Sequence, residues 1–148
     1  MTPSHWPILW PTLAMVAVMF GVWFALMRGR LHHIADHPPS RHDFASGEAV
    51  ARYFQPVERP AQNLANLFEM PVLYFALVPL LIATHQANDI QTALAWGFVQ
   101  FRALHSVVHI GPNTVRTRFR LYLAACIILS AMWIGFAIDL VVHPGGTI

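Results

Sequence analysis

Polar and charged side chains interrupt two otherwise apolar stretches of the sequence, and these are the residues that could do chemistry. They are Arg59, Gln62, Asn63, Asn66 and Glu69 in the first stretch, and Arg102, His105, Ser106 and His109 in the second. At about 100° per residue, each set falls near one face of a helix. Charged groups inside membrane segments cost about 2.5–3.5 kcal/mol each and usually mark function.

Only the four residues Gln86–Asp89 separate these stretches, so two helices joined there must be antiparallel neighbours. Their polar faces then lie at the same depth, and Glu69 can meet Arg102 or His105. Arg116 and Arg118 follow at the same end. Surplus guanidinium groups favour an anionic guest such as a carboxylate or thiolate. The alternative is a structural brace, in which such side chains only cross-link membrane helices by about 0.6–2 kcal/mol each.

Composition indicates a membrane protein. The chain has 148 residues, of which 56% are hydrophobic and 11% charged, against about 25% charged in an ordinary soluble domain. Mean hydropathy is +0.49. These values argue against a disordered chain and against a nucleic-acid binder, despite a pI near 9.2. The single cysteine, Cys126, excludes an internal disulfide and a cysteine-based metal cluster.

The elements that must position the polar residues are four membrane helices in one all-α domain, residues 1–148. We expect them over about 8–27, 63–84, 90–110 and 121–142. About 20 apolar residues suffice to span the hydrocarbon core. Pro79 predicts a kink in the second helix. A polar loop of about 28–60 follows the first helix, and its part from Phe44 to Tyr53 favours a short amphipathic helix.

Arginine placement predicts the orientation. Five arginines lie in the loop of about 28–60 and three lie in 116–120, whereas the other connection and both ends have none. Because positively charged loops stay in the cytoplasm, we expect both of these loops there and both termini on the opposite side. The polar faces of the second and third helices would then open toward the cytoplasm.

Two motifs resemble the MAPEG family, the membrane-associated proteins in eicosanoid and glutathione metabolism. Asn66-Leu67-Phe68-Glu69-Met70-Pro71 is similar to its Asn-x-x-Glu…Pro element. The run from Arg102 through His105 and His109, followed by Asn113 and Arg116-Thr117-Arg118-Phe119, is similar to its third-helix and loop element. The resemblance is greatest to bacterial members, which implies the bacterial inner membrane.

The resemblance implies a four-helix bundle that assembles as a homotrimer in the lipid bilayer, with glutathione as co-substrate between subunits. Arg118, or with a different gap Arg116, matches the arginine that stabilises the glutathione thiolate. The positions implied to hold the peptide are Asn66, Glu69, Arg102, His105 and His109, with Gln62 and Arg59 beside them. Gln62 replaces a family arginine, for which Arg59 could compensate, and His109 replaces a tyrosine. The implied activity is transfer of glutathione to a lipophilic electrophile, or reduction of a lipid hydroperoxide.

Two alternatives stay open. The family includes non-catalytic lipid-binding or adaptor members, and the replacements at Gln62 and His109 are compatible with that role. A metal enzyme is the third reading, because His105-x-x-x-His109 has helical ligand spacing and His32-His33 resembles a histidine box. Such enzymes need more histidines than one face offers here, with His5 and His143 predicted on the opposite side. We therefore expect no metal.

Overall fold

The computed structural model describes residues 6–142, so His5 and His143 lie outside the described residues. The described part is helical and contains no strand. The helices are η1 (Trp6–Ile8), α1 (Leu9–Asp36), η2 (Arg41–Phe44), α2 (Gly47–Phe54), η3 (Gln55–Val57), α3 (Arg59–Leu67), α4 (Met70–Ala83), α5 (Asp89–Ile110) and α6 (Val115–Val142). The prediction of an all-α protein is confirmed.

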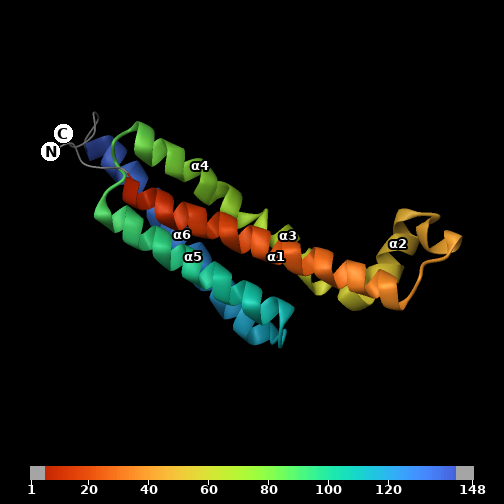
Figure 1. Ribbon diagram of the computed structural model, residues 1–148. Helices are drawn as coiled ribbons and strands as arrows, with labels where there is room; N and C mark the ends of the chain where they lie inside the picture. The colour runs from red at the N-terminus through yellow and green to blue at the C-terminus, as the bar shows by residue number, and fades with distance from the viewer. Residues whose placement is uncertain (1–5, 143–148) are drawn as a thin grey trace.

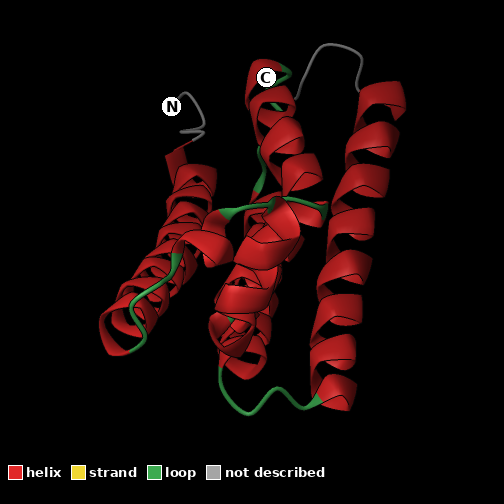
Figure 2. Ribbon diagram, turned by 90° about the vertical axis from the view of Figure 1, so that its right-hand side faces the viewer, coloured by secondary structure: helices red, strands yellow, loops and turns green. Residues whose placement is uncertain are grey.

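The long helices lie alongside one another, and the start of α1 and the end of α6 lie at the same end of the molecule (Figure 1). α5 packs against α6 and α1, α1 also packs against α3, and α4 contacts α6. Figure 2 shows the long rods from the side, joined by short connections. The connection between α4 and α5 is as short as the sequence predicts, so these two helices run in opposite directions.

α1 has 28 residues, which gives a length of about 42 Å. It continues past the expected end near Met27 as far as Asp36. The N–H of His37 bonds to the carbonyl of His33 at 2.9 Å, and two prolines follow, which cannot continue a helix. The last turns of α1 therefore extend beyond the other long helices (Figure 1).

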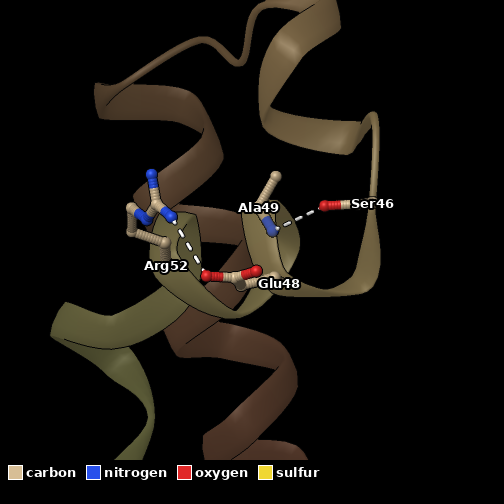
Figure 3. A network of polar contacts seen from close by, with 4 residues as sticks. All are labelled: Ser46, Glu48, Ala49 and Arg52. Carbon is tan, nitrogen blue, oxygen red and sulfur yellow. Dashed lines mark hydrogen bonds and ion pairs between the residues drawn. The ribbon is translucent and has the colours of Figure 1, made fainter.

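A small arm containing η2, α2 and η3 folds back onto this extension. Ser46 begins α2 by accepting a hydrogen bond from the N–H of Ala49 at 3.2 Å, and Glu48 pairs with Arg52 at 3.4 Å (Figure 3). α2 corresponds to the amphipathic helix predicted near residues 44–53. Its buried Phe54 lies 4.8 Å from the guanidinium carbon of Arg30, which fixes the arm to α1.

The second of the four expected helices, over about 63–84, is interrupted at Phe68 and Glu69, between α3 and α4. Pro71 explains the interruption, because it lacks an N–H and its ring conflicts with the carbonyl four residues earlier, that of Leu67. α4 runs through Pro79 from Met70 to Ala83. The helix therefore breaks beside Pro71, where no interruption was predicted, whereas α4 continues through Pro79 and a kink there stays a prediction.

Three helical segments among the described residues are long and apolar enough to cross a membrane: Leu9–Asp36, Arg59–Ala83 and Val115–Val142. The second combines α3 and α4. Large apolar side chains such as Phe24, Ile127 and Ile134 lie exposed on these segments, as expected for surfaces that face lipid. α5 is not among the three, because its polar residues lower its hydropathy.

The core between the helices is apolar with a few satisfied polar groups. Tyr74 of α4 stacks on Phe98 of α5, with ring centroids 5.0 Å apart, and its hydroxyl lies 3.0 Å from the hydroxyl of Thr12. Gln91 donates to the carbonyl of Met132 at 3.1 Å. These contacts fix α4, α5 and α6 relative to one another at the end opposite to the arm.

Candidate functional site

The two polar faces meet where α3 ends, beside the last turns of α5 and the first turns of α6. Arg102 is the residue at the centre of this region, and its side chain is fully buried. Its Nη2 donates to the backbone carbonyl and to the side-chain oxygen of Asn66, at 2.8 Å each. A buried guanidinium needs such acceptors, because a charge without them is costly.

The break between α3 and α4 creates this partnership. In a continuous helix the carbonyl of Asn66 would accept from the N–H of Met70. The helix stops before that bond can form, and the backbone N–H groups that approach this carbonyl are those of Phe68 and, at 3.4 Å, of Glu69. Arg102 therefore supplies a strong donor to a carbonyl that the broken helix leaves underused.

Asn66 links Arg102 to Glu69. Its Nδ2 donates to Glu69 Oε2 at 3.2 Å, and the carboxylate is exposed. No ion pair within 4 Å joins Glu69 to Arg102 or His105 among the residues described. The predicted meeting of the polar faces is thus seen, but the amide of Asn66 stands between the carboxylate and the guanidinium. A second bond between the faces runs from Ser106 to Asn63 at 3.4 Å.

Arg118 contacts its surroundings through both its main chain and its side chain. Its carbonyl lies 3.1 Å from His105 Nδ1, and its Nη1 donates to Asn113 Oδ1 at 2.6 Å. Asn113 adopts a left-handed conformation with φ 54°, which asparagine tolerates better than most residues. Its N–H also bonds to the carbonyl of Val108, so the loop after α5 fixes the guanidinium of Arg118.

A cavity of about 210 Å³ lies at this point. It is lined by Asn66, His105, Val115, Arg118, Phe119 and Tyr122. The ring of Tyr122 lies 5.7 Å from the guanidinium carbon of Arg102 and 6.1 Å from the ring of His105. The volume is below the range of about 300–1,000 Å³ that holds a whole small ligand, so one chain encloses only part of a ligand of that size.

Several buried nitrogen atoms around the cavity lack a hydrogen-bond partner among the described residues. They are Nε and Nη1 of Arg102, Nε of Arg118, Nε2 of His105, and both ring nitrogens of His109. Because guanidinium nitrogens can only donate, the region has a surplus of donors. That surplus favours a guest with acceptor oxygens or an anionic group.

Comparison with models of known protein families identifies the family of this chain. The MAPEG family model matches residues 8–138, which is most of the chain. The chain belongs to the MAPEG family. No curated protein and no solved structure matches the chain. Membership places it among helical membrane proteins related to glutathione and eicosanoid metabolism, and three of its helices have the length and composition of membrane spans.

The structure distributes the predicted residues of this MAPEG protein unevenly around the cavity. Of the two arginine candidates, Arg118 lines the cavity, whereas Arg116 is exposed and does not. Gln62 is also exposed, away from the lining residues. Arg59 donates to the carbonyl of Gly111 at 3.1 Å, which ties the start of α3 to the end of α5. His109 is buried and stands edge-on to His105.

Three lining residues of the MAPEG site escaped the sequence analysis, namely Val115, Phe119 and Tyr122. Val115 and Tyr122 lie three residues before and four after Arg118, so they share its face of α6, and Phe119 is the neighbour of both, four residues after Val115 and three before Tyr122. This spacing was the available signal, but apolar and aromatic residues on a membrane helix give no hint of a polar neighbour.

The histidines form no metal centre in the described part of the chain, where no group of three or more metal-ligating side chains converges. His105 and His109 stand with ring centroids 5.5 Å apart and planes at 86°. At the end of α1, His32 lies 3.2 Å from Asp36, and His33 stacks on His37. The histidine-box reading of the sequence therefore gains no support from the arrangement of these residues.

Proposed function

We propose that this MAPEG protein binds glutathione in the cavity beside Arg118 and joins it, through its sulfur, to a lipophilic electrophile. One observation carries the proposal: Arg118 lines the cavity, and Asn113 holds its guanidinium by a hydrogen bond of 2.6 Å. A fixed cation beside a thiol favours the thiolate, which is the nucleophile. The surplus of donors around Arg102 suits the carboxylates of the tripeptide.

The lipophilic partner is supported by a second cavity, of about 380 Å³, whose lining is apolar. It lies between α1 and the α3–α4 segment and includes Phe20, Leu64 and Phe68. Phe68 follows Asn66 by two residues, so the two cavities adjoin one short segment at the end of α3. An electrophile dissolved in the bilayer would reach the thiolate from this side.

We infer further that α5 forms a fourth span, with both arginine-rich connections on the cytoplasmic side of a bacterial inner membrane. The support is that α5 hides its polar residues, with Arg102, His105, Ser106 and His109 all buried. A homotrimer would complete the site, since one chain encloses only about 210 Å³. Reporter fusions at each connection and native mass spectrometry in detergent measure these two properties.

The decisive experiment compares Arg118→Ala, Arg118→Lys and the matched control Arg116→Ala in conjugation of glutathione to a chromogenic electrophile. We expect Arg118→Ala to lower kcat by about 10²–10³, the usual loss when one donor to a developing anion is removed. Arg118→Lys should keep part of the rate, and Arg116→Ala should resemble the wild type because Arg116 is exposed. Undiminished activity of Arg118→Ala would contradict the proposal.

A non-catalytic lipid-binding role is the second candidate, and the apolar cavity beside Phe68 favours it. Binding of glutathione to the wild type without any turnover would support this candidate over the transferase. Equilibrium dialysis with radiolabelled glutathione, run beside the conjugation assay, separates the two outcomes.

A further inference from the structure

We propose that His105 is the group that removes the thiol proton, through its Nε2. The proposal rests on glutathione binding in the cavity beside Arg118. It assigns to His105 a role beyond holding the peptide, and it explains why the imidazole and the guanidinium of Arg118 lie in one small cavity.

The geometry fixes which nitrogen of His105 is available. Nδ1 lies 3.1 Å from the carbonyl oxygen of Arg118. A carbonyl can only accept a hydrogen bond, so the proton of the neutral ring is on Nδ1. Nε2 then carries a lone pair, and this atom is buried and has no partner among the described residues. His105 thus brings an unpartnered acceptor to a cavity that is also lined by Arg118, whose guanidinium can only donate.

The position of the His105 ring suits proton transfer. His105 and Arg118 both line the cavity of about 210 Å³, so a sulfur held near the guanidinium is also near the imidazole. Arg118 has two roles here. Its carbonyl orients the ring of His105, and its guanidinium is held by Asn113. The first turns of α6 therefore place a base and a cation around one point.

The step balances without any further reactant. The S–H bond breaks and its electron pair stays on sulfur, while a new N–H bond forms at Nε2 of His105. A neutral thiol and a neutral imidazole become a thiolate and an imidazolium, so the net charge of the cavity does not change. No oxidation or reduction occurs. Arg118 stabilises the thiolate, and the imidazolium later releases its proton to water.

Other charged and titratable groups face His105 from each neighbouring element. Arg102 and His109 lie on α5, Arg118 and Tyr122 lie on α6, and Glu69 lies beyond Asn66 at the helix break. The carboxylate of Glu69 is occupied by the amide of Asn66 and is exposed. Among these groups, His105 is the one that lines the cavity with a free acceptor nitrogen.

The test uses His105→Asn in the full-length protein. The side-chain amide of asparagine can still donate to the Arg118 carbonyl from the place of Nδ1, but it has no atom that can take up a proton in place of Nε2. Two probes are compared, glutathione and S-methylglutathione, which carries no thiol proton. The measured quantities are binding of each probe, the ultraviolet absorbance of the thiolate after mixing, and the pH profile of kcat/KM.

We expect His105→Asn to bind S-methylglutathione as the wild type does. Its rate of thiolate formation at pH 7 should fall by about 10²-fold or more, within the range that a general base contributes. The wild-type rate should decrease as the pH is lowered through the range in which histidine gains a proton. The variant should lose this dependence and instead rise steadily with hydroxide concentration.

Thiolate formation in His105→Asn at the wild-type rate and with the wild-type pH profile would overturn the proposal. If that variant fails to bind S-methylglutathione, His105→Gln replaces it, because glutamine fills the position of Nε2 without accepting a proton. Loss of S-methylglutathione binding in both variants would make His105 a binding residue and would also overturn the proposal. Failure of the proposed function looks different, since the wild type itself would then bind neither probe.

Discussion

The guanidinium of Arg102 in α5 donates to both oxygen atoms of Asn66 in α3, at 2.8 Å each. A residue of α5 thus completes the hydrogen bonding of the segment in which α3 and α4 are interrupted. The bond pair fixes the side chain of Asn66, whose amide in turn holds Glu69 at 3.2 Å. The arrangement of the site therefore depends on a side chain that is fully buried beneath it.

Replacement of Arg102 should destabilise the protein more than replacement of any exposed arginine. Arg102→Ala removes a charged donor from two acceptors, and each such bond contributes about 1.5–3 kcal/mol. We expect a clear decrease in the melting temperature in detergent, partly recovered in Arg102→Lys, which keeps one donor group. Arg120→Ala is the control, because Arg120 is exposed at the start of α6. Equal melting temperatures for the two alanine variants would show that the bonds to Asn66 contribute nothing.

Asn66 and Glu69 should behave as a coupled pair. Asn66→Asp keeps an oxygen for Arg102 but places a second carboxylate about 3 Å from Glu69, where like charges repel. We expect weaker binding of glutathione in Asn66→Asp, and partial recovery in the double variant Asn66→Asp/Glu69→Gln. A double-mutant cycle on the dissociation constants should give a coupling of about 0.5–3 kcal/mol. Strict additivity would mean that the amide–carboxylate bond has no part in binding.

Pro71 should control the shape of the site through the helix break. Pro71→Ala restores an N–H that can bond to the carbonyl of Leu67, and it removes the ring that conflicts with that carbonyl. We expect α3 and α4 to join, Asn66 to turn away from Arg102, and glutathione binding to weaken while helix content rises. Circular dichroism and equilibrium dialysis measure the two effects. Pro79→Ala is the matched control, because Pro79 lies within α4, and it should leave binding unchanged.

Asp43 should make the arm sensitive to acid. The hydroxyl and the N–H of Ser40 both donate to its carboxylate, at 2.7 and 2.8 Å, and they lower the pKa of Asp43 below the ordinary value of 3.8. Because the folded pKa is lowered, this stabilisation is complete above pH 3.8 and is lost as the pH falls through the folded value. Hydrogen exchange of residues 40–44 should therefore accelerate in strong acid, relative to an exposed amide.

Asp43→Asn provides the control for that experiment. An asparagine does not titrate in this range, so exchange in residues 40–44 should lose its additional acid dependence. The effect should be confined to the arm, since both hydrogen bonds that the carboxylate accepts come from Ser40 beside it.

The positions of the two polar faces were predictable because helical periodicity alone groups Asn66 with Glu69 and Arg102 with His109. The resemblance to the family also limited the arginine proposed to stabilise the thiolate to Arg116 or Arg118. It could not choose between them. Arg116 and Arg118 are two positions apart on one helix, so they point in directions about 200° apart, and the rotation of α6 that decides which one faces the cavity depends on its packing. The contact of Arg118 with Asn113 depends on a left-handed residue in a loop, which helical periodicity does not predict.

The helix break was harder to foresee than the helices. Pro71 and Pro79 have the same local chemistry, yet only the first accompanies an interruption. The difference arises from a tertiary partner, since Arg102 supplies a donor to the carbonyl of Asn66 beside Pro71. Local sequence contains no information about a guanidinium 36 residues away, so the predicted kink at Pro79 was a reasonable but incomplete inference.

The inward orientation of the polar groups on α5 bears on how the chain is inserted into a membrane. Arg102 and His105 are buried against α3 and α6, whereas Leu104 and Val107 of the same helix point outward. Exposing Arg102 alone to hydrocarbon would cost about 2.5–3.5 kcal/mol, so α5 is poorly suited to enter lipid as a solitary helix. Because the bonds of Arg102 go to α3 and that of His105 goes to α6, concealing both groups takes α3, α5 and α6 together, and biogenesis should assemble these three helices in the bilayer as one unit.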